Sequence, residues 1–172
     1  MAIFKPDIYQ KNIFDIPYDT LKKEGIRLLV FDLDNTLVKV SEDTSFQDVK
    51  KLIQELKKDF TVIISSNNRM KRVKKYLDEL EIDGYAPSFK PSYYILNKIR
   101  KKYHLQKKEM CMIGDQMITD ILSGKWYHIK TILVDPLGEK DLKITSFNRK
   151  IESLILKRYL KKGIFKRGNY YE

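Results

Sequence analysis

The chain alternates short apolar runs with longer segments in which apolar residues recur every three or four positions. The apolar runs predict strands over residues 27–33, 61–65, 84–86, 110–113 and 130–134. The helical spacing predicts amphipathic helices over residues 46–58, 70–80, 92–102, 119–123 and 146–161. Such alternation is typical of βαβ units, whose parallel strands are covered by helices on both faces. We therefore expect an α/β three-layer sandwich with a mainly parallel sheet.

The pattern contains no internal repeat and no linker that would divide the chain. Its 172 residues, 42% of them hydrophobic, are enough for one domain with its own core. We expect a single domain over 1–172, with a core at about 26–136 and a basic amphipathic C-terminal helix at about 146–161. Residues 1–19 contain Pro6 and Pro17 and are predicted to be an extended lead-in or a short helix.

Composition excludes several classes of protein. The single cysteine, Cys111, excludes an internal disulfide framework and a multi-cysteine zinc site. The longest apolar run, Leu28 to Phe31, is far below the roughly 18 residues of a membrane span, and no secretory signal is visible. We expect a soluble cytoplasmic protein, with peripheral contact at the inner face of the membrane as an open alternative.

Polar residues follow four of the predicted strands, at the sheet edge where α/β proteins bind ligands. They are Asp32 and Asp34 after the first strand, Ser66, Asn67 and Asn68 after the second, Lys90 after the third, and Asp115 and Asp120 after the fourth.

These residue types suit phosphate chemistry. Asp32 and Asp34 are two positions apart in an extended segment, so their carboxylates point to the same side. Paired carboxylates repel each other, and a hard divalent cation such as Mg²⁺ resolves that repulsion where a phosphate also binds. Asp115 can supply a third carboxylate, Lys90 can balance negative charge, and the Ser66 hydroxyl can hold phosphate oxygens.

In order, Asp-x-Asp, Ser, Lys and Gly-Asp-x4-Asp resemble the four motifs of the haloacid dehalogenase superfamily of phosphohydrolases. The resemblance covers about residues 28–134. The resemblance is more specific to the YqeG family, a bacterial branch similar to enzymes that dephosphorylate phosphatidylglycerophosphate. The segments that indicate this family are 63–68, 90–91, 113–120 and 147–149. The resemblance implies a Rossmann-like fold.

The resemblance also implies a mechanism. Asp32 would attack phosphorus to form an aspartyl-phosphate, and Asp34 would protonate the leaving oxygen and then activate water. Mg²⁺ would be held by Asp32, the backbone carbonyl of Asp34, and Asp115. Ser66 and Lys90 would bind the phosphoryl oxygens.

Two further residues have supporting roles in this scheme. Asp120 would orient Lys90 or a metal-bound water, and Asn67 would contact the substrate.

Superfamily members often have a cap domain that closes over small substrates. The two insertion points span 26 residues from Thr36 to Thr61 and 25 residues from Ser66 to Lys90. The first is used by a short loop and a predicted helix, and the second by a predicted helix and a short strand. We therefore expect a capless fold with an open site. An open site favours a phosphate presented on something large, such as a lipid headgroup, a nucleic-acid end or a protein.

The net charge of +11 fits an anionic partner, although the low arginine content also indicates a lysine-rich proteome. The last 24 residues have eight basic and two acidic residues, a net charge of +6. Another stretch, Lys98 to Lys108, has six basic residues and no acidic one. We interpret it as a solvated helix face, with a role near an anionic substrate as the alternative.

The leading hypothesis is a Mg²⁺-dependent phosphatase acting on phosphatidylglycerophosphate at a membrane surface. The alternatives are a nucleic-acid end phosphatase or protein phosphatase, a phosphoacceptor switch, and a non-enzymatic RNA- or ribosome-associated binding protein. Nucleic acid is the less favoured partner, because no predicted strand face interleaves aromatic and basic residues.

Overall fold

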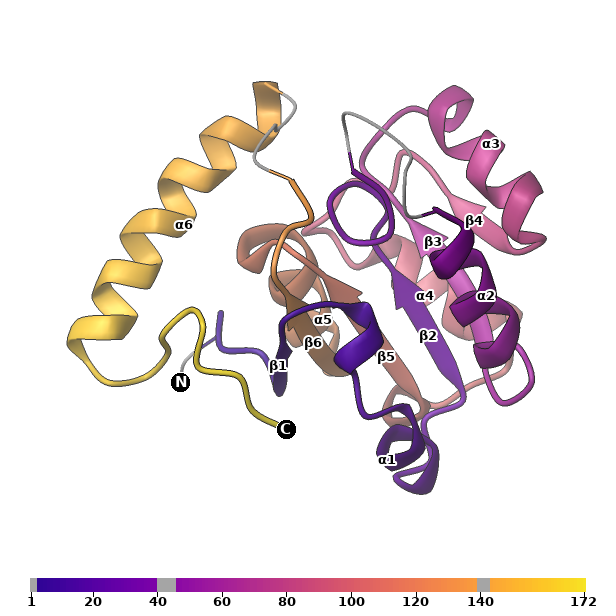
Figure 1. The fold of residues 1–172 in the computed structure, drawn as a ribbon, viewed down its shortest axis with the longest axis horizontal. Helices are drawn as coiled ribbons and strands as arrows, with labels where there is room; N and C mark the ends of the chain where they lie inside the picture. The colour runs from indigo at the N-terminus through magenta and orange to yellow at the C-terminus, as the bar shows by residue number, and fades with distance from the viewer. Residues whose placement is uncertain (1–2, 40–45, 139–142) are drawn as a thin grey trace.

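The computed structural model describes residues 3–39, 46–138 and 143–172, with the backbone alone for 143–149. Six strands form one sheet in the order β1-β6-β5-β2-β3-β4, and every neighbouring pair is parallel (Figure 1). The strands are β1 Ile8–Gln10, β2 Leu28–Phe31, β3 Thr61–Ser65, β4 Asp83–Tyr85, β5 Met110–Gly114 and β6 Lys130–Val134. The predicted α/β sandwich with a parallel sheet is confirmed.

Helices connect the strands and cover the sheet. The α-helices are α1 Tyr18–Lys23, α2 Phe46–Leu56, α3 Met70–Leu80, α4 Tyr94–Lys102, α5 Leu122–Tyr127 and α6 Lys143–Lys161. Two 3-10 turns, η1 Ile13–Asp15 and η2 Lys107–Glu109, and one π-turn, η3 Met117–Ile121, complete the described elements. No helix in these ranges has both the length and the apolar character needed to cross a bilayer.

The two faces of the sheet bury alternate residues of the same strand. On β2, Leu29 and Phe31 pack with α1, α2 and α3, whereas Leu28 and Val30 pack with α4. Figure 1 shows α2 in front of the sheet and α4 behind it. Because both faces are covered, a central strand reads as a continuous apolar run, which is why these strands were visible in the sequence.

The N-terminal segment, predicted to be an extended lead-in or a short helix, forms the strand β1, the 3-10 turn η1 and the start of α1. β1 pairs with β6, with Ile8 opposite Ile132, and becomes the edge of the sheet. The Asp7 carboxylate holds this pairing by accepting hydrogen bonds from the backbone and the hydroxyl of Thr131, both at 2.8 Å. A strand of three residues is too short to show a periodic pattern of apolar and polar residues. The sequence alone therefore did not distinguish β1 from an extended segment outside the sheet.

The helix predicted over 119–123 is replaced by η3, which leads directly into α5. The wider π-turn places the Asp120 side chain back over the start of the loop, where its Oδ2 accepts the backbone N–H of Gln116 at 3.1 Å. Turns of this kind are rare and are frequently found at functional sites. Apolar spacing does not report them, because it predicts the regular helix that a π-turn interrupts.

The C-terminal segment packs against the sheet edge beyond α6. Phe165 is buried beside Tyr9 of β1, and Tyr171 forms an antiparallel bridge with Tyr9. Figure 1 accordingly shows the C-terminal chain running beside β1. The side chains of residues 147–149, which the resemblance to the YqeG family includes, lie outside the described part.

Arg167 of this C-terminal segment forms a partly buried ionic network. Its Nη2 lies 2.5 Å from Glu152 Oε1 of α6, and its Nη1 lies 3.0 Å from Asp135 Oδ1. Glu152 is 2% exposed, so its charge depends on protein partners for solvation. Arg167 also donates to the Asp115 carbonyl at 3.4 Å, which links the C-terminal segment to the loop after β5.

Replacing Arg167 with alanine should lower the free energy of unfolding by about 2–4 kcal/mol, because the Glu152 carboxylate would remain buried without this cation. Urea denaturation followed by circular dichroism measures the change. The exposed neighbour Lys166 is the matched control, and Lys166→Ala should change stability by less than about 0.5 kcal/mol. Equal losses for both variants would contradict a specific role for the Arg167 network.

Candidate active site

The predicted site residues come together at one edge of the sheet. Asp32 directly follows β2, Ser66 follows β3 and Asp115 follows β5. Because the strands are parallel, their carboxyl ends lie at the same edge. Lys90 reaches this edge from the loop after β4, and Asp120 reaches it from η3.

The ammonium group of Lys90 is the centre of the site. Its Nζ lies 2.6 Å from Asp32 Oδ1 and 2.8 Å from Asp120 Oδ1, and donates to the Ser65 carbonyl at 2.6 Å. All these groups are buried. Burial alone would lower the pKa of Lys90, but the charges of Asp120 and Asp32 outweigh it and raise that pKa above its ordinary value. Lys90 is therefore a fixed positive charge at the site.

Three buried carboxylates form an acidic cluster around this lysine. Oxygen atoms of Asp32, Asp115 and Asp120 lie within 4.8 Å of one another. Burial raises the pKa of Asp32 well above its ordinary value, because the charge of Lys90 only partly offsets desolvation and the repulsion of Asp120 and Asp115. When all three carboxylates are ionised, they and one ammonium have a formal charge of −2. Oxygen ligands with this charge fit a hard divalent cation such as Mg²⁺, whose charge would in turn favour the ionised form of Asp32.

Two neighbouring residues fix the geometry of this cluster. The Thr36 hydroxyl lies 3.4 Å from Asp115 Oδ1, within reach for a hydrogen bond. Gly114 leaves the space that Asp120 occupies, because a Cβ at this position would lie 2.3 Å from both Cγ and Oδ2 of Asp120. The Gly-Asp motif thus requires glycine because the Asp120 side chain packs closely against it. Backbone conformation is not the reason, since the φ angle of Gly114 is not positive.

Asn67 holds the segment that contains Lys90. Its Oδ1 accepts the backbone N–H of Lys90 at 2.7 Å and the Ser88 hydroxyl at 3.0 Å, and its Nδ2 donates to the Lys90 carbonyl at 2.9 Å. The side-chain amide is thus used within the protein on both of its polar atoms. A substrate contact by Asn67 stays a prediction, and the structure adds a positioning role.

Ser66 is buried beside this segment. Its hydroxyl oxygen accepts the backbone N–H of Asn68 at 3.1 Å, which fixes the turn after β3. A hydroxyl that accepts one hydrogen bond still has its own proton to donate, so Ser66 can bind a phosphoryl oxygen while it holds the turn.

Asp34 lies near the others, but its side chain has different partners. Arg72 of α3 donates from Nη2 and Nε to Asp34 Oδ1, at 2.6 and 3.0 Å. The Asn68 amide donates to Asp34 Oδ2 at 3.1 Å. Both carboxylate oxygens are therefore oriented from the segment that follows β3. This leaves the backbone carbonyl, and not the side chain, of Asp34 as its predicted contribution to a metal site.

Arg72 and Thr36 are functional candidates to which the sequence reasoning gave no role, and Asn68 was noted only as a polar residue after the second predicted strand. Thr36 belongs to the same Asp-x-Asp-x-Thr segment, and its spacing from Asp34 was a usable signal. Arg72 is one of only seven arginines among 34 basic residues, which was a weak signal in a lysine-rich helix. Nothing local indicated that its guanidinium crosses to Asp34, because the two residues are 38 positions apart.

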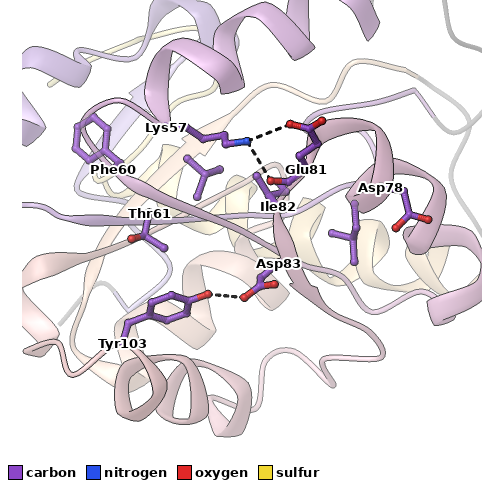
Figure 2. Close-up of a pocket in the computed structure, with 10 residues that line it drawn as sticks. Lys57, Phe60, Thr61, Asp78, Glu81, Ile82, Asp83 and Tyr103 are labelled. Atoms are coloured by element: carbon purple, nitrogen blue, oxygen red, sulfur yellow. Dashed lines mark hydrogen bonds and ion pairs between the residues drawn. The ribbon is translucent and has the colours of Figure 1, made fainter.

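A hollow of about 670 Å³ lies at the opposite end of the strands. It is lined by Thr61 at the start of β3 and Asp83 at the start of β4, together with Lys57 and Tyr103 (Figure 2). Tyr103 donates to Asp83 at 2.6 Å, and Lys57 donates to the Glu81 carbonyl at 3.0 Å. This hollow is remote from the acidic cluster, so its size does not make it the active site.

Comparisons with known proteins agree with this geometry. The family model described as mitochondrial PGP phosphatase matches residues 1–81, and the one described as HAD-hydrolase-like matches residues 89–142. The first model covers the segments with Asp32 and Ser66, and the second covers those with Lys90 and Asp115.

Two curated relatives extend over most of the chain. The probable phosphatase YqeG of Bacillus subtilis is 36% identical over 161 residues, which cover 93% of this chain and 94% of that protein. Phosphatidylglycerophosphate phosphatase 1 of Arabidopsis thaliana is 26% identical over 170 residues, covering 92% of this chain and 49% of that protein. The chain thus spans about half the length of the plant enzyme.

Solved structures match the fold at low identity. An uncharacterized protein from Listeria monocytogenes has a TM-score of 0.54 at 16% identity, covering 77% of this chain and 99% of that one. The putative HAD-hydrolase YfnB of Bacillus subtilis, bound to magnesium, has a TM-score of 0.51 at 14% identity, covering 69% and 91%. These structures share the fold of the chain, and the 36% identical relative, together with the family models, shows that the chain belongs to the YqeG family of phosphatases in the haloacid dehalogenase superfamily.

Proposed function

We propose that this phosphatase is a Mg²⁺-dependent phosphomonoester hydrolase that acts through an aspartyl-phosphate on Asp32, with phosphatidylglycerophosphate as its substrate. The observation that supports this most is the convergence of Asp32, Asp115 and Asp120 around the Lys90 ammonium at the carboxyl edge of the sheet. This arrangement combines an anionic nucleophile with a fixed cation that can neutralise phosphoryl oxygens.

The first step transfers the phosphoryl group to the protein. A carboxylate oxygen of Asp32 forms a bond to phosphorus, and the bond from phosphorus to the leaving alcohol oxygen breaks. Asp34 gives its proton to that oxygen. Lys90 holds Asp32 Oδ1 and so fixes the orientation of the nucleophile, while Ser66 and Lys90 bind phosphoryl oxygens.

The second step releases phosphate. Asp34, now ionised, takes a proton from a water molecule as the water oxygen bonds to phosphorus, and the bond between phosphorus and Asp32 breaks. Asp32 is regenerated as a carboxylate, and inorganic phosphate leaves. Mg²⁺, held by Asp32, Asp115 and the Asp34 carbonyl, would lower the repulsion between the anionic nucleophile and the anionic substrate.

Two observations favour a lipid substrate. Between β2 and β3 the described residues contain the single helix α2, and between β3 and β4 they contain α3, so neither region contains a cap domain. The site can therefore accept a phosphate that projects from a large surface. The plant relative is a phosphatidylglycerophosphate phosphatase, and the mitochondrial PGP phosphatase model matches residues 1–81. Peripheral contact with an anionic membrane would give this site access to such a lipid.

Replacing Asp32 with asparagine should reduce Mg²⁺-dependent phosphate release by several orders of magnitude, because the nucleophile is lost. Release is measured from an aryl phosphate and from phosphatidylglycerophosphate in mixed micelles, with and without a chelator. Asp48→Asn, at an exposed carboxylate of α2, is the matched control and should retain activity.

Three outcomes of this assay would contradict the proposal. They are turnover by Asp32→Asn equal to that of the control, full turnover with the chelator present, and release from a 5′-phosphorylated oligonucleotide that exceeds release from the lipid. The last result would favour the nucleic-acid end phosphatase.

Arg72→Gln should slow hydrolysis of an alkyl phosphate by about tenfold or more, and slow an aryl phosphate less, because Asp34 would lose the cation that orients it. An alkoxide needs the proton from Asp34 to leave, whereas a phenolate with low proton affinity needs it less. Steady-state kcat for both substrates measures the difference.

Lys74→Gln is the matched control for this prediction, since Lys74 lies on the same helix in an exposed ion pair with Asp78 at 2.9 Å. An Arg72→Gln variant that loses the same factor on both leaving groups would contradict the assignment of Arg72 as a positioning residue for Asp34.

A further inference from the structure

An exposed group of aromatic side chains flanks the catalytic lysine. Phe89, Tyr93 and Tyr94 are 69%, 48% and 67% exposed and lie within six residues of chain that include Lys90. We call these three residues the aromatic rim. Large apolar side chains gathered on the surface mark an interaction site more often than scattered ones do.

The backbone holds Phe89 outward. Its neighbours Ser88 and Lys90 are buried, and the Ser88 hydroxyl and the Lys90 N–H both donate to Oδ1 of Asn67. Phe89 has a φ of 56°, a left-handed conformation that is uncommon for a bulky residue. The chain is thus fixed on both sides of Phe89, and the ring faces solvent at the edge of the active site.

The chain segment that contains the rim has a positive net charge. Residues 84–108 contain seven lysines and arginines and no acidic residue. On α4, Lys98 and Lys101 are exposed and lie one and two turns after Tyr94 on the same helix face. The basic stretch of α4 is therefore exposed and adjoins the aromatic rim.

We propose that the aromatic rim and the exposed lysines of α4 form the surface by which the protein docks on an anionic phospholipid bilayer. This inference rests on the proposed function and identifies how its substrate is reached. Aromatic rings settle at the level of lipid headgroups, and lysines beside them are attracted to anionic lipids. Docking through Phe89 brings the adjacent Lys90, and with it Asp32, to the headgroup layer.

A nucleic acid fits the rim less well than a bilayer. The ring of Tyr93 stacks on Tyr127 with centroids 5.5 Å apart and an interplanar angle of 25°, so one of its faces is already covered. Base stacking on successive aromatic residues needs open ring faces. Insertion into a headgroup layer needs exposed apolar edges, and the rim provides these.

The test measures binding to vesicles and uses Asp32→Asn protein, so that no turnover occurs. Co-sedimentation is measured with phosphatidylcholine vesicles that contain or lack phosphatidylglycerol. We expect Phe89→Ser with Tyr94→Ser to weaken binding to the anionic vesicles on the order of tenfold, through lost apolar contact. Lys98→Gln with Lys101→Gln should weaken it by a similar factor and reduce its dependence on salt.

The matched control is a second exposed surface that combines apolar and basic residues, on α6. On α6, Ile151 and Leu154 are 38% and 66% exposed, and Ile151→Ser with Leu154→Ser should leave binding within about twofold of the parent, since this surface lies outside the rim. Thermal unfolding of each variant verifies that the fold is retained.

Four results would overturn the docking surface. They are no binding to anionic vesicles, equal binding to neutral vesicles, unchanged binding by folded rim variants, and a greater loss from the α6 variant than from the rim variant. Tighter binding of the same protein to single-stranded RNA than to anionic vesicles would assign the rim to RNA instead. Because an inactive protein is used, failure of this inference leaves the phosphatase assay unaffected, and the reverse also holds.

Discussion

The site depends on one interaction, the contact of the buried Lys90 ammonium with Asp32, Asp120 and the Ser65 carbonyl. A charged amine at this depth is stable only if its donors are satisfied, and each partner here comes from a different segment at the carboxyl edge of the sheet. Asn67 fixes the backbone on the lysine side, and the absent side chain of Gly114 admits Asp120 on the other. Residues of several sequence motifs thus act together to position and neutralise the ammonium group of Lys90.

The parallel sheet explains why these loops meet at all. Every strand delivers its carboxyl end to the same edge, so residues far apart in the chain approach within hydrogen-bond distance there. The C-terminal segment contributes from outside the sheet, because Arg167 joins Glu152 of α6 to the carbonyl of Asp115. Arg167, one of the basic residues in the last 24 positions, therefore has a structural function. The net charge of +6 in this segment is thus not wholly exposed surface charge.

The fold was largely predictable because β2, β3, β5 and β6 are buried on both faces and leave continuous apolar runs. Helices α2 and α3 begin at the predicted residues because each buries one regular stripe. The strand β1 and the π-turn η3 were not resolved by the pattern. The first is too short for a period, and the second interrupts a helix to direct one carboxylate.

By itself, the sequence predicted which side chains form the candidate site: Asp32, Asp34, Ser66, Lys90 and Asp115 follow strand ends, a placement that local apolar runs encode. It also determined that the segments after β2 and β3 are too short for a cap. Only the tertiary structure decided how these groups are oriented. Arg72 and Asn68 turn Asp34, Asn67 binds the Lys90 segment, and Phe89 faces outward beside it. These contacts join residues from separate loops, and their geometry exists only once the sheet has brought the loops together.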